Sequence, residues 1–392
     1  MELNYGIKFN EEEIAYLETC TDEELERILA ECEDYEIKCD TNQQNRKILL
    51  NSLYGALGNI HFRMYDLRNA TAITTFGRVA IQWIARKVNE YLNQLCGTTN
   101  IEYVFYCDTD SIYVNVEGLI NKIGLTKFDT TTKLVDFLDN FGKNNMEPVI
   151  DKGYRELCEY MNNREHLMFM DREAIACPPI GSMGLGGFWT AKKRYALCVW
   201  DMEGVRFVEP KLKIMGLETQ KSSTPKSVQK ALKESIRLML IEGESSLHEY
   251  FLQYEKEYRQ LNYKTIASVS SANNIAKYSD AKGMPIKGCP GHIKAVLAYH
   301  RIADGFPGMV RIREGEKVMI LPLQAGNMFD SESIAWPSGT ELPREIRADV
   351  VECIDYPALF SKSFIKPLQA LCTACDIHYE HRASLADMFD FF

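Results

Sequence analysis

The sequence predicts an α+β protein in which helices accompany short antiparallel strands. Three observations support this class. Apolar residues recur at helical spacing over much of residues 10–95 and again over 131–163. Two β-rich runs, 102–106 and 111–116, flank a short polar turn and predict a hairpin. After Pro225, helical patterns alternate with loops, so strands and helices do not alternate regularly along the chain.

The N-terminal region predicts exposed helices. Residues 10–36 are polar, with apolar residues at helical spacing, and we expect one or two solvated helices there. A separate helix is expected over 42–58, because Thr41 or Asn42 would serve as its N-cap.

The remaining elements follow from local signals. A long helix is expected over 72–95 and should end near Gly97. Thr224 as N-cap and Pro225 in the first turn predict the start of another helix. Many glycines and prolines predict a loop-rich stretch over 280–345. Strand-like runs are expected at 166–171, 195–200 and 205–208.

Composition limits the class of protein. The 392 residues are 46% hydrophobic, which is enough for two or three domains with large cores. Neither a membrane-spanning apolar run nor a signal-peptide pattern is present, so no membrane partner is expected. Twelve cysteines without framework spacing predict reduced thiols and a cytoplasmic location. The CxxC at Cys372 and Cys375 has no second pair, and we expect two buried thiols on a helix.

Charge is distributed unevenly. The net charge of −10 argues at first against a nucleic-acid partner. However, residues 11–40 hold thirteen acidic residues against two basic ones, whereas residues 182–237 hold eleven basic residues against five acidic ones. A polyanion could therefore bind the second segment and avoid the first.

Two carboxylates lie at the tip of the predicted hairpin. Asp108 and Asp110 are separated by one residue, and a turn could aim both side chains at one point. Their mutual repulsion favours a bound cation, and hard oxygen ligands favour Mg²⁺. Two such ions could activate an attacking hydroxyl and stabilise a leaving pyrophosphate. The alternative is an ordinary polar turn, since Asp and Thr are common in turns.

A second pattern lies on the predicted helix 42–58. Lys47, Asn51 and Tyr54 follow at i, i+4 and i+7 and so share one helix face. A cation, an amide and an aromatic ring in this order suit a nucleoside triphosphate, and Gly55 leaves room behind the ring. The apolar residues of the opposite face would then contact the protein. The alternative is an ordinary amphipathic helix with a solvated face. The opposite face comprises Ile48, Leu49 and Leu53.

A third pattern combines glycines with basic residues. The segment 181–187 is glycine-rich, but no helix pattern opens after it, so a dinucleotide site is not expected. The basic cluster that follows enters a predicted strand and suits phosphate contacts with duplex DNA, although such clusters are more commonly solvated. Upstream, Asp171 and Glu173 could join a metal shell or could simply be exposed. The cluster comprises the basic residues Lys192, Lys193 and Arg194, followed by Tyr195.

The C-terminal residues 384–392 form an apolar and aromatic tail. Such a tail would expose its rings unless a partner binds it. Leu385, Met388 and Phe389 have the spacing of a short helix that enters a groove, and Phe391 adds a further ring. The alternative is that the tail folds back onto the core of its own chain.

Taken together, these residues resemble the family B DNA polymerases. The segments RKILLNSLYG, YCDTDS and KKRY match three family motifs in the family's order. The similarity extends through KIMGLETQKSSTP to the SLADMFDFF tail. The resemblance implies a right-hand architecture with an antiparallel palm sheet. Residues 1–59 would be the C-terminal part of the fingers, 60–216 the palm with the catalytic hairpin 102–116, and 217–392 an α-rich thumb.

The resemblance implies a DNA-directed DNA polymerase that adds deoxynucleotides to a primer 3′ end during DNA replication. Asp108 and Asp110 would hold two Mg²⁺ ions, with Mn²⁺ as a possible substitute. The implied partners are primer–template DNA, deoxynucleoside triphosphates and a sliding clamp, which the tail 384–392 would bind. Nucleotide contacts are implied for Lys47, Asn51, Tyr54 and Gly55, and DNA contacts for Tyr106, Lys192, Lys193, Arg194, Tyr195 and Lys221.

The sequence departs from the family in two respects. Cys107 stands where the family usually has glycine, and a side chain there could crowd the primer end. The family's first catalytic motif and its exonuclease acids are not found, so we expect an N-terminal polymerase chain to supply them. Such a division could be a natural split or an artificial truncation. The competing hypotheses are a non-catalytic module that binds DNA and the clamp, and an unrelated α+β protein with coincidental motifs.

Overall fold

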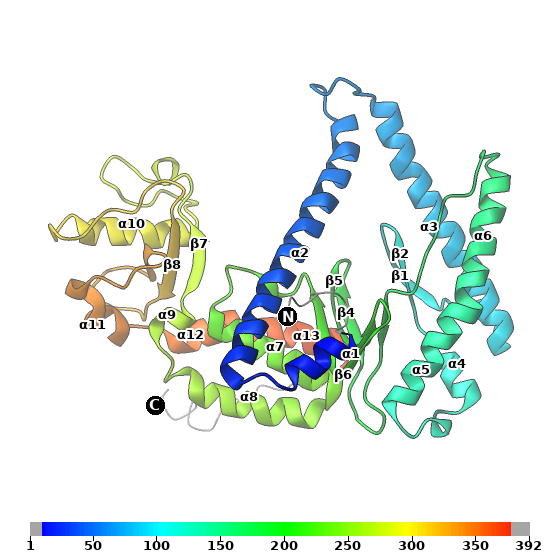
Figure 1. Cartoon of the computed structure of the whole chain (residues 1–392). Coiled ribbons are helices and arrows are strands. Elements are labelled where there is room, and N and C mark those ends of the chain that lie inside the picture. The colour runs from blue at the N-terminus through cyan, green and yellow to red at the C-terminus, as the bar shows by residue number, and fades with distance from the viewer. Residues whose placement is uncertain (1–9, 378–392) are drawn as a thin grey trace. The chain divides into compact units, whose positions relative to one another are not determined.

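The computed structural model describes residues 10–377 (Figure 1). These residues form two compact units. Within the described residues, unit 1 comprises 10–115 and 152–167, and unit 2 comprises 116–151 and 168–377. Helices dominate both units, and every paired strand is antiparallel. The predicted α+β class is therefore confirmed.

Unit 1 begins with helices α1 (Glu11–Leu17) and α2 (Asp22–Leu57). Thr21 and Glu24 close a capping box at the start of α2, which then continues without interruption for 36 residues. The prediction of a separate helix beginning at residue 41 or 42 is wrong. Neither glycine nor proline occurs between residue 22 and residue 54, so nothing in the sequence ends the helix.

Helix α3 (Leu67–Cys96) supports the predicted hairpin. Asp66 caps its N-terminus, and Gly97 ends it in the left-handed conformation, as expected. Strands β1 (Val104–Asp108) and β2 (Ser111–Val114) form the hairpin and contact α3 (Figure 1). The side chains that α3 buries recur at helical spacing: Ala70, Ala80, Ile81, Ile84, Val88 and Leu92.

Helix α6 (Glu147–Tyr160) runs from unit 2 into unit 1. In unit 1, the indole N–H of Trp83 on α3 donates to the Gly153 carbonyl at 2.9 Å. The predicted helical region 131–163 is confirmed, since α5 (Thr131–Phe141) and α6 are joined by one π-helical turn over 142–146. The sequence analysis missed α4 (Glu117–Ile123).

A four-stranded sheet in unit 2 is built around β5 (Arg194–Met202). Strand β6 (Val205–Met215) pairs along one edge of β5. Strands β4 (Gly187–Ala191) and β3 (Ala174–Ala176) pair with the two ends of β5. The predicted strand over 166–171 is wrong, because those residues are not part of a ladder.

Helices pack with this sheet in one continuous apolar core. Helix α7 (Lys226–Ile241) follows Pro225 as predicted, but no side chain caps it, so the expected cap by Thr224 is wrong. Helices α8 (Glu244–Tyr258) and α13 (Lys366–Ala374) complete the layer. Aromatic rings with centroids 4.8–6.2 Å apart fill its centre: Phe251, Tyr254, Tyr258, Phe360 and Phe364.

The stretch 280–345 is more ordered than predicted. It contains α10 (Gly291–Ala303), β8 (Lys317–Pro322) and β9 (Ser333–Pro337). With β7 (Ser268–Ser271), the two strands form an antiparallel sheet in the order β7-β8-β9, and α10 packs against it (Figure 1). The glycines and prolines lie mainly between these elements. The short helices nearby are α9 (Tyr263–Ile266), α11 (Arg344–Glu352) and α12 (Tyr356–Phe360).

Three further expectations concern the CxxC cysteines, membrane-spanning helices and the C-terminal tail. Cys372 is buried on α13, Cys375 follows at its end, and burial raises the pKa of each thiol to about 12, as suits structural cysteines. Among residues 10–377, no helix is both long enough and apolar enough to cross a membrane. The predicted clamp-binding tail, 384–392, lies outside the described residues.

Candidate functional site

The hairpin places one carboxylate at the end of strand β1 and the other in the two-residue turn that follows. Asp108 pairs with Ser111, and Thr109 and Asp110 form the turn between them. Thr109 has a φ of 57°, which is uncommon for a β-branched residue and stores backbone strain. The Asp110 N–H donates to the Asp108 carbonyl at 2.7 Å and tightens the turn. The two carboxylates therefore belong to one compact, strained feature.

The Asp108 carboxylate is held by its neighbours. The Thr109 hydroxyl donates to Oδ1 at 3.1 Å, and the Tyr106 hydroxyl lies 3.5 Å from Oδ2. The Tyr106 ring packs against Tyr113 of β2, with centroids 5.3 Å apart. Strand alternation places the Cys107 side chain on the face opposite to Asp108. The thiol therefore does not compete for space on the carboxylate's own face of the hairpin.

Asp110 is exposed and affects the buried Tyr154 of α6. Burial raises the pKa of the Tyr154 hydroxyl, and the negative charge of Asp110 raises it further. This interaction indicates that, within unit 1, the Asp110 carboxylate lies near enough to Tyr154 of α6 to affect its ionisation. A bound cation at the turn would reduce that effect.

Two asparagines on α3 position the hairpin, and the sequence analysis missed both. Asn89 Oδ1 accepts the Val104 N–H at 2.8 Å, where β1 begins. Asn93 accepts the Ile101 N–H at 3.0 Å and donates to the Ile101 carbonyl at 2.8 Å. Their i, i+4 spacing near the end of a long helix was the available signal, but which backbone groups they contact depends on the fold.

The donor set at the turn suits magnesium. Both side chains offer hard oxygen atoms, and Mg²⁺ commonly binds through one or two carboxylates together with substrate phosphates and water. Among the described residues, no group of three or more His, Cys, Asp and Glu side chains is placed to hold a metal. Asp108 and Asp110 therefore offer carboxylate oxygens of the kind that Mg²⁺ takes as ligands.

The predicted nucleotide-binding face lies on the second half of α2. Lys47, Asn51 and Tyr54 are all exposed, and a Cβ built at Gly55 would meet no atom within 4 Å. The expectation that the opposite face contacts the protein is wrong for the described residues. The apolar side chains of this face, Ile48, Leu49 and Leu53, are between 59% and 72% exposed. Transfer of such side chains out of water is favourable, so their exposure is unusual.

The predicted basic cluster forms a second hairpin turn, in unit 2. Ala191 of β4 pairs with Arg194 of β5, so Lys192 and Lys193 form a two-residue turn. Lys193 has a φ of 61°, and its carbonyl approaches Gly216 so closely that a Cβ there would lie 2.3 Å away. A glycine at 216 is therefore required for this turn to form. Both lysines are exposed at the tip of the hairpin.

Tyr195 is less accessible than the lysines. Its side chain is 5% exposed and stacks on Trp189, with ring centroids 5.3 Å apart. The packing fixes β4 against β5 beneath the turn. A DNA contact by Tyr195 stays a prediction, and the ring's visible contribution is to support the two lysines.

Arg194 and Lys221 share one acidic partner, Glu218. The Arg194 guanidinium donates to both oxygens of Glu218, at 2.8 and 2.9 Å, and Lys221 Nζ donates at 2.9 Å. Burial acts to raise the pKa of Glu218, but hydrogen bonds from Lys221 and Arg194 outweigh it and lower the pKa. Their charge is therefore partly neutralised, which weakens any attraction for phosphate.

The glycine-rich segment does not form a phosphate-binding loop. A Cβ built at Gly184 would lie 2.3 Å from the Leu240 carbonyl at the end of α7. The adjacent Leu185 N–H donates to the Met239 carbonyl at 3.0 Å. The glycine thus permits close backbone packing against α7.

Glu173, the third predicted metal ligand, lies in unit 2. Its carboxylate pairs with Lys213 of β6 at 2.6 Å, and about half of the side chain is exposed. No cation is needed to balance its charge while this pair holds. Whether Glu173 binds a metal stays a prediction.

Comparison with known proteins identifies close relatives. Residues 23–141 match the sequence model of DNA polymerase family B. The chain is 59% identical, over 388 residues, to the DNA-directed DNA polymerase of Enterobacteria phage T4. It is also 59% identical, over 391 residues, to the DNA-directed DNA polymerase of Escherichia phage RB69. The alignments cover 99% and 100% of this chain but only 43% of each relative. The chain therefore spans less than half the length of these relatives.

Proposed function

We propose that the chain is a family B DNA polymerase segment that corresponds to the C-terminal part of the T4 and RB69 enzymes, and that it acts in template-directed DNA synthesis. The support is its 59% identity to both enzymes and the family match over residues 23–141. In this proposal it adds deoxynucleotides to a primer 3′ end during phage DNA replication. The observation that carries the proposal is the placement of Asp108 and Asp110 at one strained hairpin tip, where Asp108 ends β1 and Asp110 lies in the turn. Tyr106 contacts the Asp108 carboxylate, and α3 contacts both strands.

The proposed roles follow from side-chain chemistry. Magnesium held by Asp108 and Asp110 would lower the pKa of the primer hydroxyl and neutralise charge on the phosphates. The exposed ammonium of Lys47 would pair with the triphosphate, and Asn51 would donate a hydrogen bond to it. Tyr54 would pack on the nascent base pair, and open space at Gly55 supports a close approach there.

The two lysines at the β4–β5 turn are the proposed phosphate contacts on the primer strand. Lys192 and Lys193 are exposed at a hairpin tip that Tyr195 and Gly216 hold in shape. A turn that is already fixed loses little conformational entropy when DNA binds. The two lysines are therefore suited to hold the primer strand in a defined position. Arg194 and Lys221 are weaker candidates, because both already pair with Glu218.

We propose the N-terminal part of the polymerase as the partner of α2, whether it belongs to the same polypeptide or to a separate one. Helix α2 carries a seam of side chains spaced alternately three and four residues apart. Seams with this spacing pack against a second helix in coiled coils. Several of them are exposed although they are apolar, including Leu49 at 72%. The relatives extend well beyond the aligned segment and could supply such a helix. The seam comprises Leu25, Ile28, Cys32, Tyr35, Cys39, Asn42, Arg46, Leu49 and Leu53.

The test is primer extension by the chain combined with the N-terminal part of the polymerase. We expect extension only when both parts are present, because the chain offers two candidate metal-binding carboxylates, Asp108 and Asp110, and because α2 exposes apolar side chains that a partner could cover. Asp108→Asn and Asp110→Asn should each abolish extension while DNA binding persists. Glu102→Gln, an exposed change just before the same hairpin, should leave the rate unchanged.

A non-catalytic role in binding DNA and the clamp is the second candidate. It would be favoured if the combined parts extended a primer at the same rate with and without the two aspartates. Robust extension by the chain alone would contradict the need for a partner.

The remaining proposals concern domains and the clamp. The fingers, palm and thumb boundaries at residues 59 and 216 are proposed from the family motifs. The tail 384–392 is proposed to bind a sliding clamp. Its deletion should shorten the products made per binding event when the clamp is present, and should change little when the clamp is absent.

A further inference from the structure

The two aspartates of the hairpin tip differ in how their side chains are held. The Thr109 hydroxyl donates to the Asp108 carboxylate, and the Tyr106 hydroxyl lies 3.5 Å from its Oδ2. Within residues 10–377, by contrast, no hydrogen bond reaches the Asp110 side chain. A metal ligand needs a neighbour that fixes its orientation, so a group that could hold Asp110 should lie close by.

Tyr154, in the second half of α6, is a polar neighbour of Asp110 within unit 1. The residue is only 4% exposed, whereas Asp110 is exposed at the turn. Burial raises the pKa of the Tyr154 hydroxyl most, and the charge of Asp110 adds to the effect, so the two groups lie within electrostatic reach of each other.

The backbone beside Tyr154 is fixed by close contact between α6 and α3 (Figure 1). The indole N–H of Trp83 donates to the Gly153 carbonyl at 2.9 Å. A Cβ built at Gly153 would lie 3.0 Å from Ile84 Cδ1, so the absence of a side chain lets the two helices approach closely. The residue that follows, Tyr154, therefore starts from a fixed backbone position.

The ring of Tyr154 is fixed as well. It stacks on His166, with ring centroids 6.3 Å apart. One turn and a half further along α6, Tyr160 stacks on Trp83 with centroids 5.7 Å apart and holds the helix on α3 a second time. A hydroxyl on so restrained a ring loses little conformational entropy when it makes a hydrogen bond.

Helix α3 also holds the hairpin that carries Asp110. Asn89 Oδ1 accepts the Val104 N–H at 2.8 Å, so the strand that leads to the turn is attached to the same helix as Tyr154. The positions of Tyr154 and Asp110 are therefore both set by contacts with α3 inside one compact unit. The carboxylate itself lies on an exposed turn, where its side chain can change rotamer.

We propose that Tyr154 is a positioning residue that holds the Asp110 carboxylate, through a hydrogen bond from its hydroxyl, when a divalent cation binds at the turn. The inference rests on the proposed function. Tyr154 itself does not touch the substrate. Each aspartate would then be supported by one tyrosine hydroxyl, Asp108 by Tyr106 of its own strand and Asp110 by Tyr154 of α6.

The experiment measures Mn²⁺ affinity in the chain combined with the N-terminal part of the polymerase, primer–template DNA and a non-hydrolysable deoxynucleotide. Tyr154→Phe removes the hydroxyl and keeps the ring, and should weaken Mn²⁺ binding by about 10- to 100-fold. The matched control is Tyr103→Phe, at a residue of unit 1 that is 5% exposed and whose hydroxyl lies 2.9 Å from Thr98 Oγ1. It should leave Mn²⁺ affinity unchanged.

A double-mutant cycle identifies the aspartate through which Tyr154 acts. In the Asp110→Ala background, Tyr154→Phe should change Mn²⁺ affinity less than about twofold, because the carboxylate that it holds is already missing. In the Asp108→Ala background the effect of Tyr154→Phe should persist. A purely structural role would weaken Mn²⁺ binding equally in both backgrounds.

The outcomes separate the inference from the proposed function. If the wild-type complex fails to extend a primer, the proposed function is wrong and the inference falls with it. If the complex extends a primer but Tyr154→Phe binds Mn²⁺ like wild type, or weakens binding equally in both aspartate backgrounds, the inference alone is overturned.

A second variant covers the case in which Tyr154→Phe does not assemble. Trp83→Phe releases the Gly153 carbonyl and leaves Tyr154 intact. It should weaken Mn²⁺ binding in the Asp108→Ala background and change it little in the Asp110→Ala background. Equal effects in the two backgrounds would again overturn the inference.

Discussion

The side chain of Asn89 fixes the start of strand β1, because its Oδ1 accepts the Val104 N–H at 2.8 Å. Val104 is buried, so water cannot easily replace this bond. Helix α3 thereby determines where the strand that ends at Asp108 begins. The position of the carboxylate turn thus depends on a polar contact that reaches back fifteen residues along the chain.

We expect Asn89→Ala to loosen the hairpin. An unsatisfied buried N–H costs about 1–3 kcal/mol, which corresponds to roughly 10- to 100-fold faster exchange of the Val104 amide. Hydrogen exchange measures this directly. Gln94→Ala, an exposed change one turn later on α3, should leave the exchange rate unchanged. Equal exchange in the two variants would show that Asn89 does not hold the strand.

Lys47→Ala should weaken nucleotide binding by the assembled polymerase. Loss of a hydrogen bond to a charged group costs about 1.5–3 kcal/mol, so we expect KM for the deoxynucleotide to rise by roughly 10- to 100-fold. Steady-state extension kinetics give this value. Lys38→Ala, which removes an exposed lysine from the same helix, is the control and should change KM little. A similar KM in both variants would remove Lys47 from the nucleotide site.

Gly216→Ala should disturb the β4–β5 turn. An alanine at this positive φ costs about 1–2 kcal/mol, and contact with the Lys193 carbonyl at 2.3 Å adds about 1–3 kcal/mol. Gly204→Ala is the matched control, because Gly204 also has a positive φ but its Cβ would meet open space. Calorimetric unfolding should show the larger loss for Gly216→Ala. Equal losses would mean that the turn adjusts to the methyl group.

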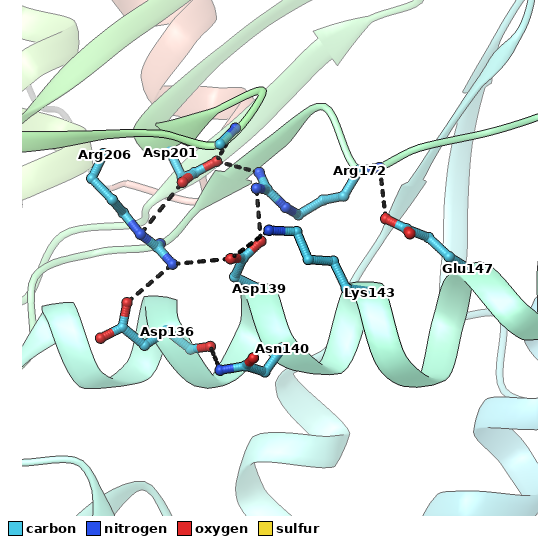
Figure 2. A network of polar contacts seen from close by, with 9 residues as sticks. Asp136, Asp139, Asn140, Lys143, Glu147, Arg172, Asp201 and Arg206 are labelled. Atoms are coloured by element: carbon cyan, nitrogen blue, oxygen red, sulfur yellow. Dashed lines mark hydrogen bonds and ion pairs between the residues drawn. The ribbon is translucent and has the colours of Figure 1, made fainter. Parts of the chain in front are cut away.

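Acid should weaken the ion pairs that Asp139 forms with Lys143 and Arg172 (Figure 2). Burial acts to raise the pKa of Asp139, but Lys143 and Arg172 outweigh it, so the folded-state pKa lies below the ordinary 3.8. The ionised carboxylate therefore stabilises the fold fully above about pH 4, and this stabilisation is lost as pH falls through the folded-state pKa. In thermal unfolding between pH 6 and pH 3, the advantage of wild type over Asp139→Asn should shrink with acid. A constant difference would contradict the assignment.

Local signals predicted the elements with strong caps or turns. The helix ending at Gly97, the hairpin around Asp108 and the β5 strand after Lys193 all appear where the sequence places them. Each is specified by residues close in the chain: a glycine that ends the helix, two β-rich runs around a polar turn, and a strand-like run after the basic cluster. The continuous α2 was missed because a good cap at Thr41 was taken as a helix start, although nothing before it ends the preceding helix.

The features of the candidate site likewise fall into those that the sequence predicts and those that depend on the fold. The sequence by itself determined which residues are proposed to carry the chemistry, Asp108, Asp110 and Lys47 among them, because side-chain type and spacing are local properties. Only the tertiary structure decided that Asn89 anchors the hairpin, that Glu218 neutralises Arg194 and that Arg172 meets Asp139 and Asp201. Those contacts join residues from 15 to 33 positions apart, and the packing of separate elements, which no local spacing encodes, brings them within hydrogen-bonding distance.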